Sequence, residues 1–169
     1  MEVVEGNVDI DDVGAFVADL DAIGDRHGAV VQAFDARYVV DRAHLERAVE
    51  LAGRARERGD TIADDFGVEI LLYAAGRRQI NRALAMGVSE GECPVVAVVV
   101  DEAGQSGTDN ERAAADDLRD LLTPAETLGA YDEERVRAFF DVSDTELAAT
   151  EGTVADAVRE RVALLPVEK

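Results

Sequence analysis

Apolar residues recur along this chain with two different periods, and the changes of period predict its secondary structure. Residues 2–10 (EVVEGNVDI) alternate loosely and predict a first strand, whereas apolar residues from Val13 to Ile23 fall at helical spacing. Residues 29–34 form a short apolar run of strand length. Five valines within residues 95–100 predict a buried strand, which tolerates Pro94 only at its start.

Helical spacing covers most of the remaining chain. The clearest amphipathic helix runs from Asp41 to Arg58, and the most apolar segment from Val68 to Ala75. Later helices are predicted at 109–122, with Leu118, Leu121 and Leu122 pointing inward, and at 133–140. A short helix is predicted to begin at Ser143, with Glu146 at the capping-box position. The last helix is predicted at 154–165, after the N-cap residue Thr153. These elements predict an α+β fold, with a small mixed or antiparallel sheet packed with several helices in a single layered domain of residues 1–169.

Composition narrows the class of protein. An apolar content of 47% excludes intrinsic disorder, and no run approaches the ~18 apolar residues of a membrane span, so we expect a soluble, cytoplasmic protein. His27 and His44 do not stand beside a Ser, Cys or paired acid at a catalytic spacing. The lone Cys93 is typical of a small core residue. We therefore expect no enzyme activity, no metal and no cofactor.

The charge is strongly acidic but unevenly spread. A net charge of −20 ordinarily argues against a nucleic-acid partner. However, 37 acids against 16 arginines and the single Lys169 resemble the composition of salt-adapted halophilic proteins, in which an acidic surface is the background. Residues 37–82 hold nine arginines and eight acids, so this segment is a relative positive patch. Concentrated salt screens the long-range attraction between charges, whereas the short, paired hydrogen bonds of arginine persist.

The positive patch surrounds the most apolar helix. Residues 68–75 carry a single charge, Glu69, and Gly76 then ends the helical pattern. The polar residues that follow at once are Arg77, Arg78, Gln79, Asn81 and Arg82. A helix that is apolar on all sides belongs in a core, so these residues are expected where a rigid element reaches the surface. This arrangement predicts a binding site.

Three segments resemble the small kinase-binding subunit of the KEOPS complex. They are ARYVVDRAHLERAVELAGRA (36–55), TIADDFGVEILLYAAGRRQINRALAMGV (61–88) and PVVAVVV (94–100), and EILLYAAGRRQI is the most specific part. The resemblance implies a non-catalytic protein that binds the small atypical kinase/ATPase subunit of KEOPS. It also implies that the protein helps to deliver tRNA by gripping its 3′ CCA end, for threonylcarbamoylation of the adenosine beside the anticodon.

The family signature Gly-x-Arg-Gln-Ile falls on Gly76, Arg78, Gln79 and Ile80. Arg78 suits a phosphate or a cytosine carbonyl, Gln79 suits a base edge, and Gly76 lets the backbone approach a ligand. Further phosphate contacts are expected from Arg77, Arg82, Arg54 and Arg58. Ile80 is expected to pack in the core.

Other roles remain open from the sequence. Tyr38 or Tyr73 suits stacking on an unpaired base, although either is also a common core residue. Glu69 is expected to pair with an arginine or with backbone amides near Gly76, ordering the turn from behind. The alternative function is a regulatory subunit that activates the kinase without touching RNA. The candidates for kinase contact are Leu164, Leu165 and Val167.

Overall fold

The computed structural model describes residues 1–105 and 107–166 and divides the chain into two compact units. One unit comprises residues 1–36 and 87–127, and the other comprises residues 37–86 and the described residues from 128 onward. The antiparallel sheet and the many helices confirm the α+β class, while the single domain of residues 1–169 stays a prediction. In the described part of the chain, no helix is long and apolar enough to cross a membrane.

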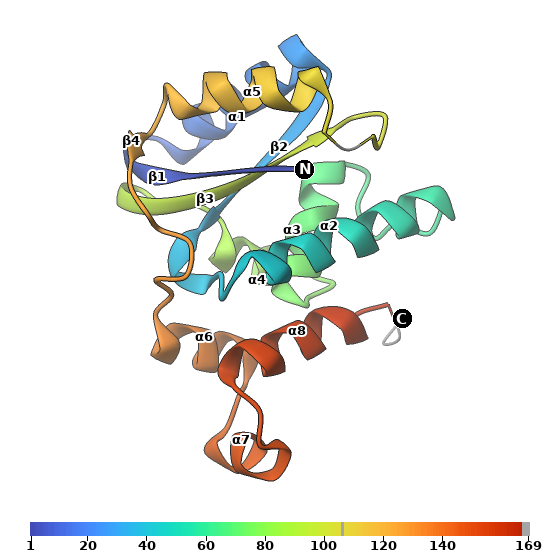
Figure 1. Cartoon of the computed structure of the whole chain (residues 1–169), viewed down its shortest axis with the longest axis vertical. Coiled ribbons are helices and arrows are strands. Elements are labelled where there is room, and N and C mark those ends of the chain that lie inside the picture. The colour runs from blue at the N-terminus through green and yellow to red at the C-terminus, as the bar shows by residue number, and fades with distance from the viewer. Residues whose placement is uncertain (106, 167–169) are drawn as a thin grey trace. The chain divides into compact units, whose positions relative to one another are not determined.

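The first unit is a four-stranded antiparallel sheet covered on one face by two helices (Figure 1). The strands lie in the order β2-β3-β1-β4. Their bounds are Glu2–Ile10 for β1, Ala29–Asp35 for β2, Gly91–Asp101 for β3 and Thr123–Pro124 for β4. Helices α1 (Val13–His27) and α5 (Asp109–Arg119) pack Phe16, Leu20 and Leu118 against alternate residues of the strands. Cys93 is buried in this core, as expected.

Two details of this unit differ from the sequence-based expectation. Strand β3 begins at Gly91, so Pro94 lies inside the strand and not at its start. The pairing of β2 with β3 extends only as far as Val95. A residue without an N–H group is tolerated beyond that point. Helix α5 ends before residue 122 because the chain tightens there, with the Leu121 N–H donating to the Leu118 carbonyl. This turn moves Leu121 off the buried face and leaves it 38% exposed.

The second unit is helical. Its α-helices are α2 (Arg42–Glu57), α3 (Phe66–Ala75), α4 (Ile80–Ala83), α6 (Glu133–Phe140), α7 (Asp144–Thr150) and α8 (Val154–Leu164). Short 3-10 turns lie at Ala36–Tyr38 and Leu84–Met86. The predicted bounds of α2, α6 and α8 are confirmed to within a residue, since the caps Asp41, Asp132 and Thr153 accept hydrogen bonds from the first turns of these helices.

Helix α3 is the buried centre of this unit, as its all-round apolar sequence predicted. Every residue from Glu69 to Ala75 is buried. His44 of α2 fastens the end of α3: its Nδ1 accepts the Val40 N–H at 3.3 Å, so its Nε2 is the protonated nitrogen and donates to the Ala74 carbonyl at 2.7 Å. Burial lowers the pKa of His44, which favours this neutral form.

Candidate functional site

The turn after α3 has a defined backbone shape. Gly76 adopts the left-handed conformation, with φ 61° and ψ 33°. Its N–H donates to the Tyr73 carbonyl and the Arg77 N–H donates to the Leu72 carbonyl, each at 3.1 Å. This pair of bonds is the Schellman arrangement, which satisfies the last carbonyls of a helix and sends the chain off in a fixed direction.

Three polar side chains that follow the turn face solvent. Arg78, Gln79 and Arg82 are all exposed, and no hydrogen bond or ion pair joins the Arg78 or Arg82 guanidinium to another residue that the structure describes. Gln79 is the N-cap residue of α4, but its side chain makes no capping bond. Its carboxamide is therefore available as both donor and acceptor. The predicted exposure of this polar group is confirmed.

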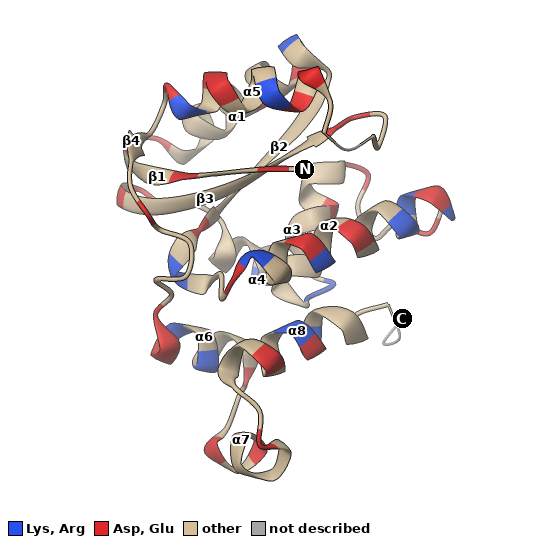
Figure 2. Cartoon of the chain, viewed as in Figure 1, with Lys and Arg blue, Asp and Glu red and all other residues tan. Residues whose placement is uncertain are grey.

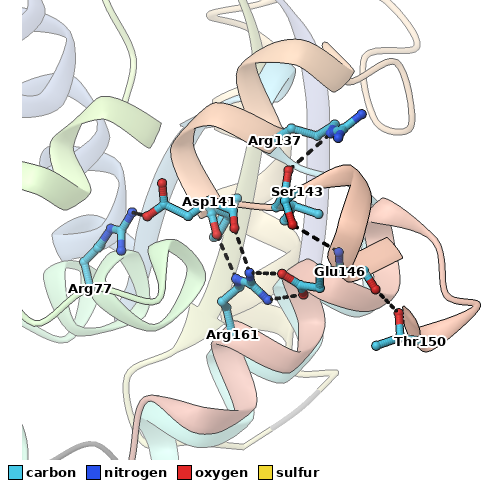
Figure 3. Close-up of polar contacts among 9 residues, drawn as sticks. Arg77, Arg137, Asp141, Ser143, Glu146, Thr150 and Arg161 are labelled. Carbon is cyan, nitrogen blue, oxygen red and sulfur yellow. Dashed lines mark hydrogen bonds and ion pairs between the residues drawn. The ribbon is translucent and has the colours of Figure 1, made fainter. Parts of the chain in front are cut away.

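Arg77 was expected to contact phosphate, and the structure corrects that expectation. Its guanidinium donates to the Phe139 carbonyl at the end of α6 and lies 5.1 Å from the centre of the Phe139 ring. Asp141 Oδ2 lies 4.0 Å away (Figure 3). Only 25% of the Arg77 side chain is exposed. An arginine engaged with a helix end and a ring presents little of itself to an external ligand.

Ile80 was expected in the core but is 48% exposed, so that expectation is wrong. Leu84, four residues further on, is 57% exposed. Helix α4 is only four residues long, and it buries Ala83 instead. A single turn of helix cannot bury side chains on both of its sides. The two exposed apolar side chains thus stand within the same short segment as Arg78 and Arg82.

The two candidate stacking tyrosines differ. Tyr73 is fully buried and is excluded as an external stacking platform; desolvation, reinforced by the charge of Glu69, raises the pKa of its hydroxyl. Tyr38 is half-buried, with its ring edge-on to Phe139 at 5.6 Å between centroids. Only Tyr38 therefore retains any surface for a base.

Glu69 has a different partner from the one expected. It is fully buried, and its carboxylate accepts the Ala63 N–H at 2.8 Å and the Ile62 N–H at 3.0 Å. Backbone amides are thus its partners, but they lie in the loop before α3 and not near Gly76. The physical reason is direction: helical side chains point toward the N-terminus, which carries this carboxylate away from the turn. Glu69 orders the loop between α2 and α3.

Comparison with known proteins gives the family. The model of the family described as "Kinase binding protein CGI-121" matches residues 16–165, which is most of the chain. The chain belongs to the CGI-121 family. A search of curated proteins finds no match. As a member of the CGI-121 family, the chain is a kinase-binding protein, and the turn after α3 lies within the matched region.

The three residues of this CGI-121 family member that were expected to contact the kinase differ in their exposure. Leu164, at the end of α8, is 42% exposed and stays a candidate. Leu165 is 1% exposed and packs in the interior, so it is corrected to a core residue. Val167 lies outside the described residues.

The arginines of α2 are partly engaged on its surface. Arg54 and Arg47 both bind Glu50, at 2.5 and 3.0 Å, as expected for i,i+4 and i,i+3 pairs. Arg58 is exposed at the end of the helix. Its charge and that of Arg78 both act to lower the pKa of the Tyr73 hydroxyl. Acidic and basic residues both occur along α2 (Figure 2). Arg58 is the better placed of the two α2 candidates.

Titratable side chains elsewhere make structural pairs. His27 Nε2 lies 2.6 Å from Asp117 Oδ2, which also accepts from Arg26 at 2.8 Å. These contacts join α1 to α5, and the His27 hydrogen bond is the main reason that the pKa of Asp117 is lowered. Within residues 1–105 and 107–166, no three His, Cys, Asp or Glu side chains converge to hold a metal ion. The His27, Arg26 and Asp117 contacts therefore serve to hold α1 and α5 together.

Sequence reasoning missed the Ile80 and Leu84 pair. A signal was present, because the polar run RRQ is followed by INRAL before Met86 and Gly87. A helix that begins after such a run and ends within one turn has no length for a full buried face. The exposed pair follows from the shortness of α4.

Proposed function

We propose that this kinase-binding protein is the non-catalytic subunit that brings tRNA to the kinase of a KEOPS complex, holding the RNA by its single-stranded 3′ CCA end. The observation that carries the proposal is the rigid turn that presents Arg78, Gln79 and Arg82 to solvent. The bound tRNA would then be threonylcarbamoylated by the other subunits, as the resemblance to this family implies.

The chemistry of the turn fits an unpaired RNA end. Guanidinium groups form paired, charge-assisted hydrogen bonds with phosphate. The Gln79 carboxamide offers a donor and an acceptor, which matches the edge of a base. Unpaired bases need an apolar surface for their faces, and Ile80 and Leu84 supply one beside the cations. Phosphate, base edge and base face are thus each matched within residues 78–84.

The salt-adapted composition supports short contacts in place of long-range attraction. At about 1 M salt the screening length is about 3 Å, so a net charge of −20 repels RNA only at contact distance. Arg78 and Arg82 are exposed and not tied into ion pairs with described residues. Binding at this site therefore depends on local geometry and not on overall charge.

A second candidate function is a regulatory subunit that activates the kinase without contacting RNA. It is favoured by the exposed Leu164 on α8, which offers an apolar contact to a protein partner. Both functions share kinase binding, so RNA binding is the measurement that separates them.

The test combines one double variant with a matched control. Arg78→Ala with Gln79→Ala is expected to abolish tRNA binding in molar KCl and to leave kinase pull-down intact. Arg112→Ala with Gln105→Ala removes the same two residue types from exposed positions of the other unit, and should bind tRNA like the parent protein. A tRNA lacking its last three nucleotides should bind as weakly to the parent protein as full-length tRNA binds to the double variant. Full-length tRNA binding that survives the double substitution would show that the turn after α3 is not the RNA site. A parent protein that binds the kinase but no tRNA would refute the RNA proposal and leave the regulatory one.

A further inference from the structure

The carboxyl end of α6 receives two arginines from other parts of the chain. The Phe139 carbonyl accepts from Arg77, and the Phe140 carbonyl accepts from Arg161 Nε at 2.7 Å. Arg161 Nη2 also donates to the Asp141 carbonyl at 3.0 Å. Carbonyls at the end of a helix lack partners within the helix and carry partial negative charge, so cations are favoured there.

Arg161 is itself fixed. Its guanidinium forms a bidentate pair with Glu146 of α7, at 2.7 and 2.6 Å, and both side chains are about three-quarters buried (Figure 3). This pair joins α8 to the start of α7 and to the end of α6. Gly76 packs directly on the same place, since a Cβ built on it would lie 3.5 Å from the Arg161 Cβ and carbonyl oxygen. The turn after α3 therefore rests on a rigid support.

Arg77 connects the turn to this support. It is the first residue after Gly76, its backbone closes the Schellman turn, and its side chain reaches the end of α6. The guanidinium also lies over Phe139, whose ring is held edge-on by Phe140 and Tyr38, with centroids 4.9 and 5.6 Å away. One residue thus carries both the backbone and the side-chain attachment of the turn.

We propose that Arg77 is a positioning residue: it pins the turn of residues 76–79 to the carboxyl end of α6, so that Arg78 and Gln79 face solvent in a preset shape. This inference rests on the proposed RNA-binding function and adds the device that orders its site. Arg77 contributes to RNA affinity without touching RNA. Without this attachment, the turn must become ordered when RNA binds, and the entropy lost in that ordering lowers the affinity for RNA.

The measurement that separates positioning from direct contact is the salt dependence of binding. Each phosphate contact to single-stranded RNA contributes about 0.7 to the slope of log K against log salt. Arg77→Ala should weaken tRNA binding about tenfold with an unchanged slope, because no phosphate contact is lost. Arg78→Ala should weaken binding and also reduce the slope by about 0.7.

Two further variants keep the test sharp. Arg77→Lys retains a cation for the Phe139 carbonyl and removes the buried Arg77 Nε, which has no hydrogen-bond partner among the described residues. It should recover most of the affinity. Arg135→Ala makes the same charge change on α6, where Arg135 pairs with the neighbouring Asp132 at 3.3 Å, and should bind tRNA like the parent protein. Among these three variants, measured without RNA, only Arg77→Ala should show faster amide hydrogen exchange at residues 78–82.

The outcomes are distinct. Parent-like affinity and exchange in Arg77→Ala would overturn the positioning role while leaving RNA binding intact. A slope reduced by about 0.7 in Arg77→Ala would overturn it too, because Arg77 would then contact a phosphate. If the parent protein itself binds no tRNA, the proposed function fails, and the positioning role fails with it.

Discussion

Replacing Gly76 by alanine tests the left-handed backbone on which the candidate site depends. Gly76 has a φ of 61°, a conformation that costs an L-residue about 1–2 kcal/mol. The added Cβ would lie 3.5 Å from its nearest neighbours on Arg161, which is ordinary van der Waals contact, so no clash adds to that cost. We expect Gly76→Ala to lower the free energy of unfolding by about 1–2 kcal/mol.

Gly53 supplies the matched control for this substitution. It lies inside α2, and no described residue beyond its own stretch of helix would come within 4 Å of an added Cβ. Alanine in a helix interior is favoured over glycine by about 0.5–1 kcal/mol, so Gly53→Ala should stabilise the protein. Urea unfolding at one fixed KCl concentration should place the two variants on opposite sides of the parent. If Gly76→Ala is as harmless as Gly53→Ala, the turn is not left-handed and the reasoning about the site is refuted.

Three further predictions concern groups that hold the helical unit together. In a double-mutant cycle, Arg161→Ala and Glu146→Ala should show a coupling of about 1–2 kcal/mol by urea unfolding; additive effects would show that the pair is not formed. Glu69→Gln leaves one acceptor for the Ile62 and Ala63 amides, so their hydrogen exchange should quicken while that of α8 does not. Because folding lowers the pKa of His44, the unfolded chain binds a proton at this histidine more readily than the folded chain does. The contribution of neutral His44 to the free energy of unfolding is therefore complete above about pH 6.5 and is lost as the pH falls. His44→Gln should remove that slope, which reaches at most about 1.4 kcal/mol per pH unit; an unchanged slope would place its origin elsewhere.

Local patterns in the sequence were enough for most of the fold. Period and caps located the three long strands and most of the helices, because these signals act between residues a few positions apart. The all-round apolar run of α3 likewise predicted its burial and the exposed turn that follows. Strand β4, with two residues, and helix α4, with four, carried too little pattern to be predicted.

The corrected residues depend on contacts that no local pattern encodes. Arg77 and Arg78 are neighbours of the same type, yet only Arg77 reaches the Phe139 carbonyl, 62 positions away along the chain. Glu146 stood at the capping-box position, and Ser143 does cap α7, but the Glu146 carboxylate binds Arg161 instead. In each case, the side chain has a reasonable role beside its own sequence neighbours, but in the fold it binds a polar group from a distant part of the chain instead.

The proposed RNA binding requires an anion to be held by a strongly acidic chain, and the engagement of its arginines bears on that requirement. Charge in the positive patch is not uniform: Arg47 and Arg54 share Glu50, and Arg77 is directed inward to α6. Arg78 and Arg82 remain exposed without ion pairs to described residues. Because a paired cation has little attraction left for phosphate, the turn after α3 and the exposed Arg58 offer more usable positive charge than these engaged arginines. If the proposed function holds, the excess of acids in the rest of the chain disfavours RNA away from this turn.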